Sequence, residues 1–148
     1  MAESIVIVSA ARTPIAGLLG DFSSLAAWEL GAVAIQAAVA RAGVPGDAID
    51  EVLMGNCLMA GQGQAPARQA MRLAGLPDSA GAVTLSKMCG SGMRAMMFAN
   101  DMLQAGSANV VLAGGMESMT NAPHLTALRK GVKYGSAEIG RASCRERV

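Results

Sequence analysis

Short, unbroken runs of apolar residues alternate along the chain with segments in which apolar residues recur every three or four positions. The first pattern predicts buried strands and the second predicts helices. We expect four strands, at residues 4–10, 49–55, 81–85 and 109–113. Three helices are expected between them, at residues 25–42, at residues 65–74 and from residue 93 to Gly106.

The predicted helices have recognisable boundaries. Ser23 or Ser24 is placed to cap the first helix, and Pro66 suits the first turn of the second. Gly43 and Gly106 stand where a left-handed residue commonly ends a helix. The residues of the first helix that we expect to face inward are Trp28, Val33, Ala34 and Ala37.

Strand and helix alternate up to about residue 119. Strands that are apolar throughout are typical of parallel sheets covered by helices on both faces. The pattern therefore predicts an α/β fold with a largely parallel sheet that starts at residues 4–10. In such folds ligands gather at the carboxyl ends of the strands. Residues 120–136 are polar and irregular, without a clear element.

The composition fits one domain with a buried core. Of the 148 residues, 52% are hydrophobic and 16% are charged, which is typical of a folded rather than a disordered chain. Aromatic residues make up only 3%, against 18 glycines and 11 methionines, so small and flexible side chains must fill the core. The net charge of +1 gives no electrostatic reason to expect nucleic acid or an acidic membrane as a partner.

Cysteine and histidine usage limits the chemistry further. Cys57, Cys89 and Cys144 are widely spaced, and the one histidine is His124, so neither a structural zinc site nor a disulfide framework is expected. The first residues carry no basic leader-like region, and the longest uncharged segment, near residues 30–40, is too short to span a bilayer. We therefore expect a soluble protein in the cytoplasm.

Cys89 is the residue best suited to catalysis. It lies between the predicted strand at residues 81–85 and the helix that follows. Free N–H groups and the positive dipole of a helix start stabilise an anion, which would lower the pKa of a thiol from about 8.5 toward neutrality. We therefore predict a thiolate nucleophile whose own backbone N–H serves an oxyanion hole. The alternative is an inert, buried cysteine.

The neighbours of Cys89 bear on this choice. Gly90 and Gly92 lack side chains, which would let a substrate carbonyl approach the sulfur and leave backbone donors open to an oxyanion. Lys87 and Arg94 could lower the thiol pKa, but solvated cations are the favoured interpretation. Met88 is expected to be a packing residue that could line an acyl pocket.

Three further residues remain open or structural. Cys57 follows the second strand and is expected to be a small core residue. Glu117 and Ser118 follow the fourth strand, where they either order the active-site loops or form a capped strand-end turn.

Several strings occur together in a fixed order. Alone each would be weak, but jointly the chain resembles the thiolase family, and its acetyl-CoA acetyltransferases in particular, from Ile5 to about Ile139. The strings are residues 10–14 (AARTP), 55–57 (GNC), 66–70 (PARQA), 87–92 (KMCGSG) and 113–119 (AGGMESM).

The resemblance implies a layered αβα fold and a reaction. The residue matching Cys89 takes an acyl group as a thioester, and a second acyl-CoA, deprotonated at its alpha carbon, attacks it to form a 3-ketoacyl-CoA. The reverse reaction is thiolytic cleavage. Coenzyme A thioesters are then substrates, and no metal or redox cofactor is implied. For two acetyl-CoA molecules the product is acetoacetyl-CoA; the alternative is a 3-ketoacyl-CoA thiolase of fatty-acid breakdown.

The resemblance also implies limits and partners. Family members are usually homodimers or homotetramers, and Arg68 and Gln69 would support a subunit contact, with a surface salt bridge as the alternative. The family's catalytic histidine, second cysteine and oxyanion-hole asparagine come from the distal half of its chains. Neither His124 nor Cys144 has the matching context, so neither is expected to be catalytic.

The matched residues suggest a division of the chain. Residues 1–119 are expected to form a partial N-terminal thiolase domain, and residues 120–138 the start of a loop region that helps to hold coenzyme A. Residues 139–148 fit no family pattern and are expected to be a read-through tail. A chain of this extent, about a third of a family member, is expected to be inactive on its own.

Overall fold

The computed structural model describes residues 4–125 and the pair 140–141. Three strands form a parallel sheet: β1 (Glu51–Gly55), β2 (Gly81–Leu85) and β3 (Val111–Gly115). Their order is β2-β1-β3, so β1 lies in the centre, with Glu51 opposite Gly81 on one side and Val111 on the other. The predicted α/β fold with a parallel sheet is thus confirmed, and the carboxyl ends of all three strands meet at one edge.

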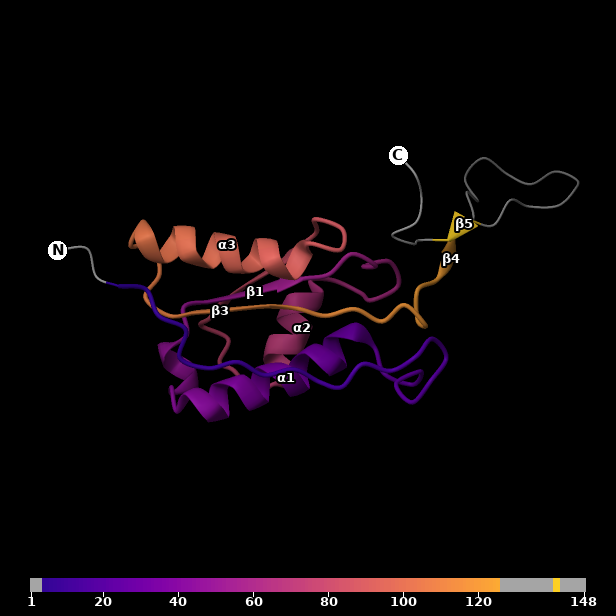
Figure 1. The fold of residues 1–148 in the computed structure, drawn as a ribbon, viewed down its shortest axis with the longest axis horizontal. Helices are drawn as coiled ribbons and strands as arrows, with labels where there is room; N and C mark the ends of the chain where they lie inside the picture. Colours follow the sequence, from indigo (N-terminus) through magenta and orange to yellow (C-terminus); the bar gives the residue numbers. More distant parts are fainter. Residues whose placement is uncertain (1–3, 126–139, 142–148) are drawn as a thin grey trace, which may run out of the picture.

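Three helices cover the two faces of this sheet. They are α1 (Ala27–Ala42), α2 (Pro66–Leu73) and α3 (Ser91–Gln104), and a short 3-10 helix η1 (Gly46–Ala48) precedes β1. Figure 1 shows α3 on one face and α1 with α2 on the other, which makes three layers. A small antiparallel pair, β4 (His124–Leu125) and β5 (Gly140–Arg141), lies outside the sheet.

The central strand β1 supplies the core on both faces. Successive side chains of a strand point to opposite sides, so Val52 and Met54 pack into the cluster that includes α1 and α2, whereas Leu53 packs against α3. The α3 side is filled by Ala95 and Ala99, whose small side chains bring the helix close to the sheet. The prediction that small residues fill the core holds for this layer.

Helix ends follow local chemistry. Gly43 and Gly106 have φ of 64° and 69°, as predicted for the residues that end α1 and α3. Pro66 is the first residue of α2, where Thr84 of β2 accepts a hydrogen bond from the Ala67 N–H at 2.9 Å. The predicted serine cap of α1 is wrong, since Glu29 instead accepts a 2.7 Å hydrogen bond from the N–H at the cap position.

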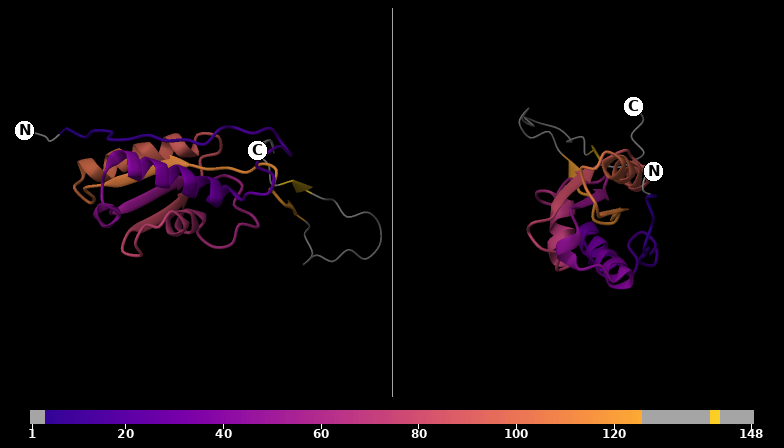
Figure 2. Two further views of the ribbon diagram at one scale, coloured as in Figure 1. Left: turned by 90° about the horizontal axis from the view of Figure 1, so that it is seen from below. Right: turned by 90° about the vertical axis from the view of Figure 1, so that its left-hand side faces the viewer.

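The strand expected at residues 4–10 is also wrong. This segment is extended but pairs with no strand in the described part of the chain, and its apolar side chains at residues 5–8 are exposed. Figure 2 shows it running along the outside of the helices, and the Arg41 guanidinium donates to the Ala10 carbonyl at 2.9 Å. An apolar run predicts extended backbone, but pairing depends on a partner strand that the run does not identify.

One inward-facing prediction in α1 also fails. Val33 is exposed, whereas Ala32 and Ile35 are buried and Trp28 packs against the core. Both sets have helical spacing, so the sequence pattern left the rotation of α1 about its axis uncertain.

Candidate active site

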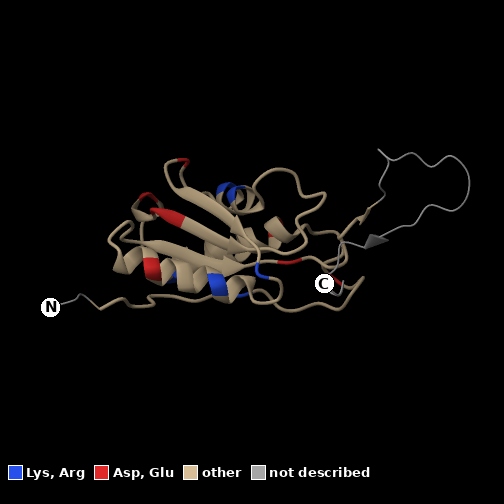
Figure 3. Cartoon of the chain, turned by 90° about the horizontal axis from the view of Figure 1, so that it is seen from above, with Lys and Arg blue, Asp and Glu red and all other residues tan. Residues whose placement is uncertain are grey.

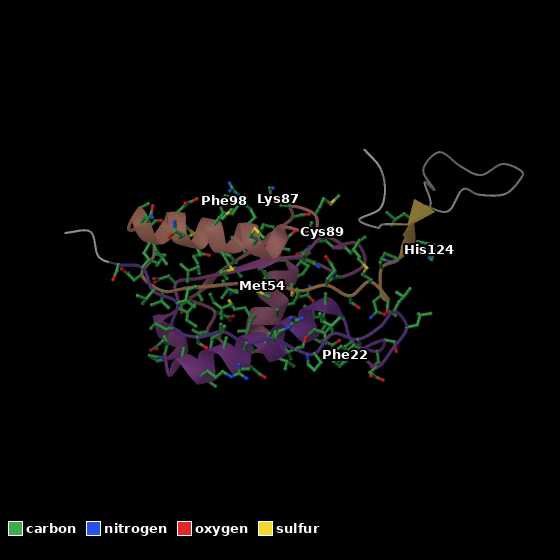
Figure 4. The ribbon with its side chains drawn as sticks, viewed as in Figure 1. Phe22, Met54, Lys87, Cys89, Phe98 and His124 are labelled. Atoms are coloured by element: carbon green, nitrogen blue, oxygen red, sulfur yellow. The ribbon has the colours of Figure 1, made fainter. Side chains whose placement is uncertain are left out.

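Cys89 lies in a short loop between β2 and α3. Strand β2 ends at Leu85 and α3 begins at Ser91, so the predicted delivery of the cysteine by a strand and its placement at a helix start are confirmed. The thiol is exposed rather than buried, which argues against an inert core cysteine. Figure 4 shows Cys89 on the loop that leads into α3.

The loop is held in one shape by hydrogen bonds around Met88. Met88 has φ of 48°, a left-handed conformation that costs a non-glycine residue about 1–2 kcal/mol. The buried Ser91 hydroxyl donates to the Met88 carbonyl at 2.6 Å and accepts from the Lys87 N–H at 2.8 Å. The Ser91 N–H also donates to the Met88 carbonyl, at 3.1 Å. These contacts fix the peptide that immediately precedes Cys89, the predicted nucleophile.

The backbone donors near the thiol differ from the sequence prediction. The Gly90 N–H, which was expected to stay open to an oxyanion, donates to the Lys87 carbonyl at 3.0 Å, because the loop closes on itself as a tight turn. The Cys89 N–H makes no hydrogen bond to another described residue. Its role in an oxyanion hole stays a prediction.

Glycines let the start of α3 sit directly on the strand ends. A Cβ at Gly55, the last residue of β1, would lie 2.5 Å from both the Gly92 nitrogen and the Ser91 carbonyl carbon. A Cβ at Gly92 would lie 3.6 Å from the backbone of Gly115 at the end of β3, which is an ordinary contact, so this position faces the sheet and not the approach of a substrate. The site therefore depends on backbone contact between three elements.

Behind the loop, Glu117 holds the segment that follows β1. Its carboxylate accepts hydrogen bonds from the N–H groups of Cys57 and Leu58, at 2.8 and 3.1 Å, and from the Asn56 amide at 2.7 Å. Asn56 is buried and also donates to the Met116 carbonyl at 3.1 Å. Of the two interpretations of Glu117, the ordering of loops beside the site is confirmed.

Cys57 is not the core residue that its sequence position predicts. It is half-buried, and its Sγ lies 2.7 Å from the Met88 carbonyl and 3.4 Å from the Ser91 hydroxyl. Ser91 and Asn56 also belong to the site, although their sequence positions did not predict it. Asn56 directly follows β1, and Glu117 lies two residues after the adjacent parallel strand β3, and that pattern is a signal that could have paired them.

Comparison with known proteins agrees with this arrangement. Residues 5–146 match the family model for the thiolase N-terminal domain. The chain belongs to the thiolase family. A crystal structure of the Acat5 thiolase from Ascaris suum in complex with coenzyme A has a TM-score of 0.88 at 39% identity, covering 92% of this chain and 35% of that one.

Curated relatives of this thiolase chain are acetyl-CoA acetyltransferases, which are enzymes. The mitochondrial protein of Xenopus tropicalis is 52% identical over 137 residues, 93% of this chain and 32% of the relative. The mitochondrial protein of Homo sapiens is 47% identical with the same coverage. The protein of Rhizobium meliloti is 51% identical over 136 residues, 92% of this chain and 35% of the relative. The chain thus spans about a third of their length.

The relatives correct the expected location of this thiolase chain. The cytoplasmic prediction is wrong, because acetyltransferases from Xenopus tropicalis, Bos taurus and Homo sapiens are named as mitochondrial, although a bacterial relative also matches. The prediction relied on the first residues of the chain, which do not determine the compartment. In the described residues no helix is long and apolar enough to cross a membrane.

The two cationic residues near Cys89 lie in different surroundings. Lys87 is exposed, and the Arg94 guanidinium lies 4.2 Å from the centre of the Phe98 ring, one turn along α3. Lys87 fits the favoured interpretation of a solvated cation, whereas Arg94 is half-buried and stacks on an aromatic ring. Met88 is exposed beside the thiol and is not a packing residue here.

Acidic and basic residues are interspersed over the described chain (Figure 3).

Arg68 and Gln69 make contacts within the chain. Arg68 donates to the Ala80 carbonyl at 2.6 Å and pairs with Asp78 at 3.2 Å. Gln69 donates to the carbonyls of Gln62 and Gln64, both at 2.7 Å. These bonds fit the structural interpretation, and a subunit contact stays a prediction.

The remaining predictions concern the end of the chain. His124 is exposed in β4, which pairs with β5, and Figure 4 shows it on the segment leading away from the sheet. Cys144 and most of residues 139–148 lie outside the described residues, and the family match extends to residue 146, so the read-through origin stays a prediction. The described residues hold no group of three or more His, Cys, Asp or Glu that could bind a metal ion.

Proposed function

We propose that this chain supplies the nucleophile of an acetyl-CoA C-acetyltransferase. The observation that carries the proposal is an exposed thiol on a fixed loop at the start of α3. The names of the relatives support acetyl-CoA as the substrate. The neighbour solved with coenzyme A supports the same class of ligand.

The chemistry follows from a cysteine nucleophile. The Cys89 thiolate attacks the carbonyl carbon of acetyl-CoA, the bond from that carbon to the coenzyme A sulfur breaks, and the coenzyme A thiolate leaves and takes up a proton. The alpha carbon of a second acetyl-CoA, after loss of a proton, then attacks the thioester. A carbon–carbon bond forms, the bond to Cys89 breaks, and acetoacetyl-CoA leaves. A thioester keeps the carbonyl electrophilic for both steps, and the proposal needs no metal or redox cofactor.

Intact mass spectrometry tests the first half-reaction. The purified chain is incubated with acetyl-CoA, and we expect one acetyl adduct that is absent from Cys89→Ala. Parallel incubations with longer acyl-CoA molecules test the alternative of a broader 3-ketoacyl-CoA thiolase. An adduct that survives in Cys89→Ala would rule out Cys89 as the nucleophile, and the absence of an adduct from a chain with a folded circular-dichroism spectrum would rule out acylation by the chain alone.

A second proposal concerns the chain in isolation. On α3 the side chains of Met93, Met96, Met97 and Phe98 are exposed, as are those of residues 5–8. An apolar surface of this kind is typical of a face that packs against further protein. We therefore expect the 148-residue chain to form no acetoacetyl-CoA by itself. A coupled assay of a longer product that contains this sequence together with the distal part of a relative separates this outcome from a failure of Cys89. Light scattering on that product tests the predicted homodimer or homotetramer.

A further inference from the structure

Cys57 is held in place by its backbone and reaches the nucleophile loop with its side chain. Its N–H donates to the Glu117 carboxylate at 2.8 Å, and the next N–H, of Leu58, donates to the same carboxylate at 3.1 Å. Asn56, on its other side, is buried, and its amide donates to Glu117 at 2.7 Å. The position of the Cys57 side chain is thus fixed from both sides along the chain.

The Cys57 thiol contacts the Met88 carbonyl, which accepts several of the hydrogen bonds that hold the loop. Its Sγ lies 2.7 Å from the Met88 oxygen, which also accepts from the hydroxyl and the N–H of Ser91. Met88 is the left-handed residue directly before Cys89. A strained conformation of this kind persists only where surrounding contacts over-determine it, and Cys57 is the contact that comes from a different strand end.

We propose that Cys57 is a positioning residue for Cys89. By donating its S–H to the Met88 carbonyl it holds the peptide that sets the direction of the Cys89 side chain, and through Glu117 it ties that direction to the ends of β1 and β3. The inference rests on the proposed function of Cys89 as the acyl acceptor. Cys57 itself touches no reacting atom and takes no acyl group.

Packing alone is the competing explanation, and the hydrogen-bond donor distinguishes the two. Cys57→Ser keeps a donor at nearly the same place, since a hydroxyl replaces the thiol. Cys57→Ala removes the donor and some volume. Cys57→Val fills the space without a donor. If Cys57 positions the loop, variants that keep the hydrogen-bond donor should behave like the unchanged chain. If it only packs, variants that keep the side-chain volume should do so.

Two readouts are measured on the full chain and its three variants. The first is the rate at which Cys89 is acetylated by acetyl-CoA, followed by mass spectrometry of the Cys89 peptide. A misplacement of about 1 Å lowers a reaction rate about 100-fold. We expect a loosened loop to lower the acetylation rate about tenfold in Cys57→Ala and Cys57→Val, a smaller loss than that limit. The rate of Cys57→Ser should stay within about twofold of that of the unchanged chain. The second is amide hydrogen exchange at Gly90 and Ser91, whose N–H groups close the loop; protection should fall in the first two variants and return in the third.

The outcomes separate this inference from the proposed function. If the unchanged chain takes no acetyl group, the proposed function fails for the chain alone, and amide exchange still decides whether Cys57 holds the loop. Equal exchange and equal acetylation in Cys57→Ala and the unchanged chain would overturn the inference. So would a Cys57→Val variant that behaves like the unchanged chain, because volume would then be sufficient.

Discussion

Two carboxylates tie β1 to β3 at opposite ends of the sheet. At the amino end, Asp50 accepts the N–H groups of Asn109 and Val110 at 2.7 and 3.0 Å. At the carboxyl end, Glu117 accepts the N–H groups of Cys57 and Leu58. In each case an acidic side chain next to one strand holds backbone donors next to the other.

The surroundings of the two carboxylates differ. Asp50 is exposed, so water competes for its hydrogen bonds. Glu117 is half-buried, receives a third hydrogen bond from Asn56 and lies beside glycines that allow backbone contact. The end that carries Cys89 is therefore fixed by several side-chain contacts, while the Asp50 carboxylate at the other end joins only β1 and β3. Rigid support is concentrated where the predicted nucleophile would need a defined direction.

Gly55→Ala should produce the largest effect. The added Cβ would lie 2.5 Å from backbone atoms of Ser91 and Gly92, and neither side can yield without moving α3 or β1. Such overpacking costs about 1–3 kcal/mol and sometimes more, and we expect the upper end of that range because both contacts are backbone. Urea denaturation of the chain measures the loss.

A matched control exists in the loop before α1. Nothing lies within 4 Å of a Cβ at Gly17, and its φ is outside the left-handed range. Gly17→Ala should therefore leave the free energy of unfolding unchanged or raise it slightly. Equal stability of the two alanine variants would show that α3 does not rest on Gly55.

The sequence predicted where Cys89 lies better than it predicted the contacts that hold its loop. Strand β2, helix α3 and the loop between them were predicted from periodicity and from Gly106, which are local signals. Glu117 lies 61 residues from Asn56, and a contact of that range follows from the strand order, which no local pattern contains. The prediction of a paired strand at residues 4–10 failed for the same reason, because strand pairing depends on a second segment that the local sequence does not identify.

Glu117→Gln should have an intermediate effect. The amide keeps one acceptor oxygen but presents N–H groups to donors of Asn56, Cys57 or Leu58, so at least one donor loses its partner. A polar group left unsatisfied costs about 1–3 kcal/mol when buried, and the half-exposed position places the expected loss at about 1–2 kcal/mol. Urea denaturation gives the loss, and amide exchange at Cys57 and Leu58 should rise with it. Unchanged protection at both amides would contradict the role of Glu117.

The smallest effect is expected at the amino end and depends on pH. Hydrogen bonds from the N–H groups of Asn109 and then Val110 to the charged form hold the pKa of the Asp50 carboxyl below its ordinary value of 3.8. Because the folded-state pKa is the lower one, these bonds stabilise the fold fully above pH 3.8 and lose that effect as the pH falls through the folded-state pKa. Asp50→Asn should therefore be less stable than the unchanged chain at pH 7, with a difference that shrinks in acid denaturation series below pH 3.8. Asp21→Asn is the control, because Asp21 is exposed and has no described hydrogen bond to lose. If the stability difference between Asp50→Asn and the unchanged chain stayed constant down to about pH 2, the charged form of Asp50 would not be the one that holds β3.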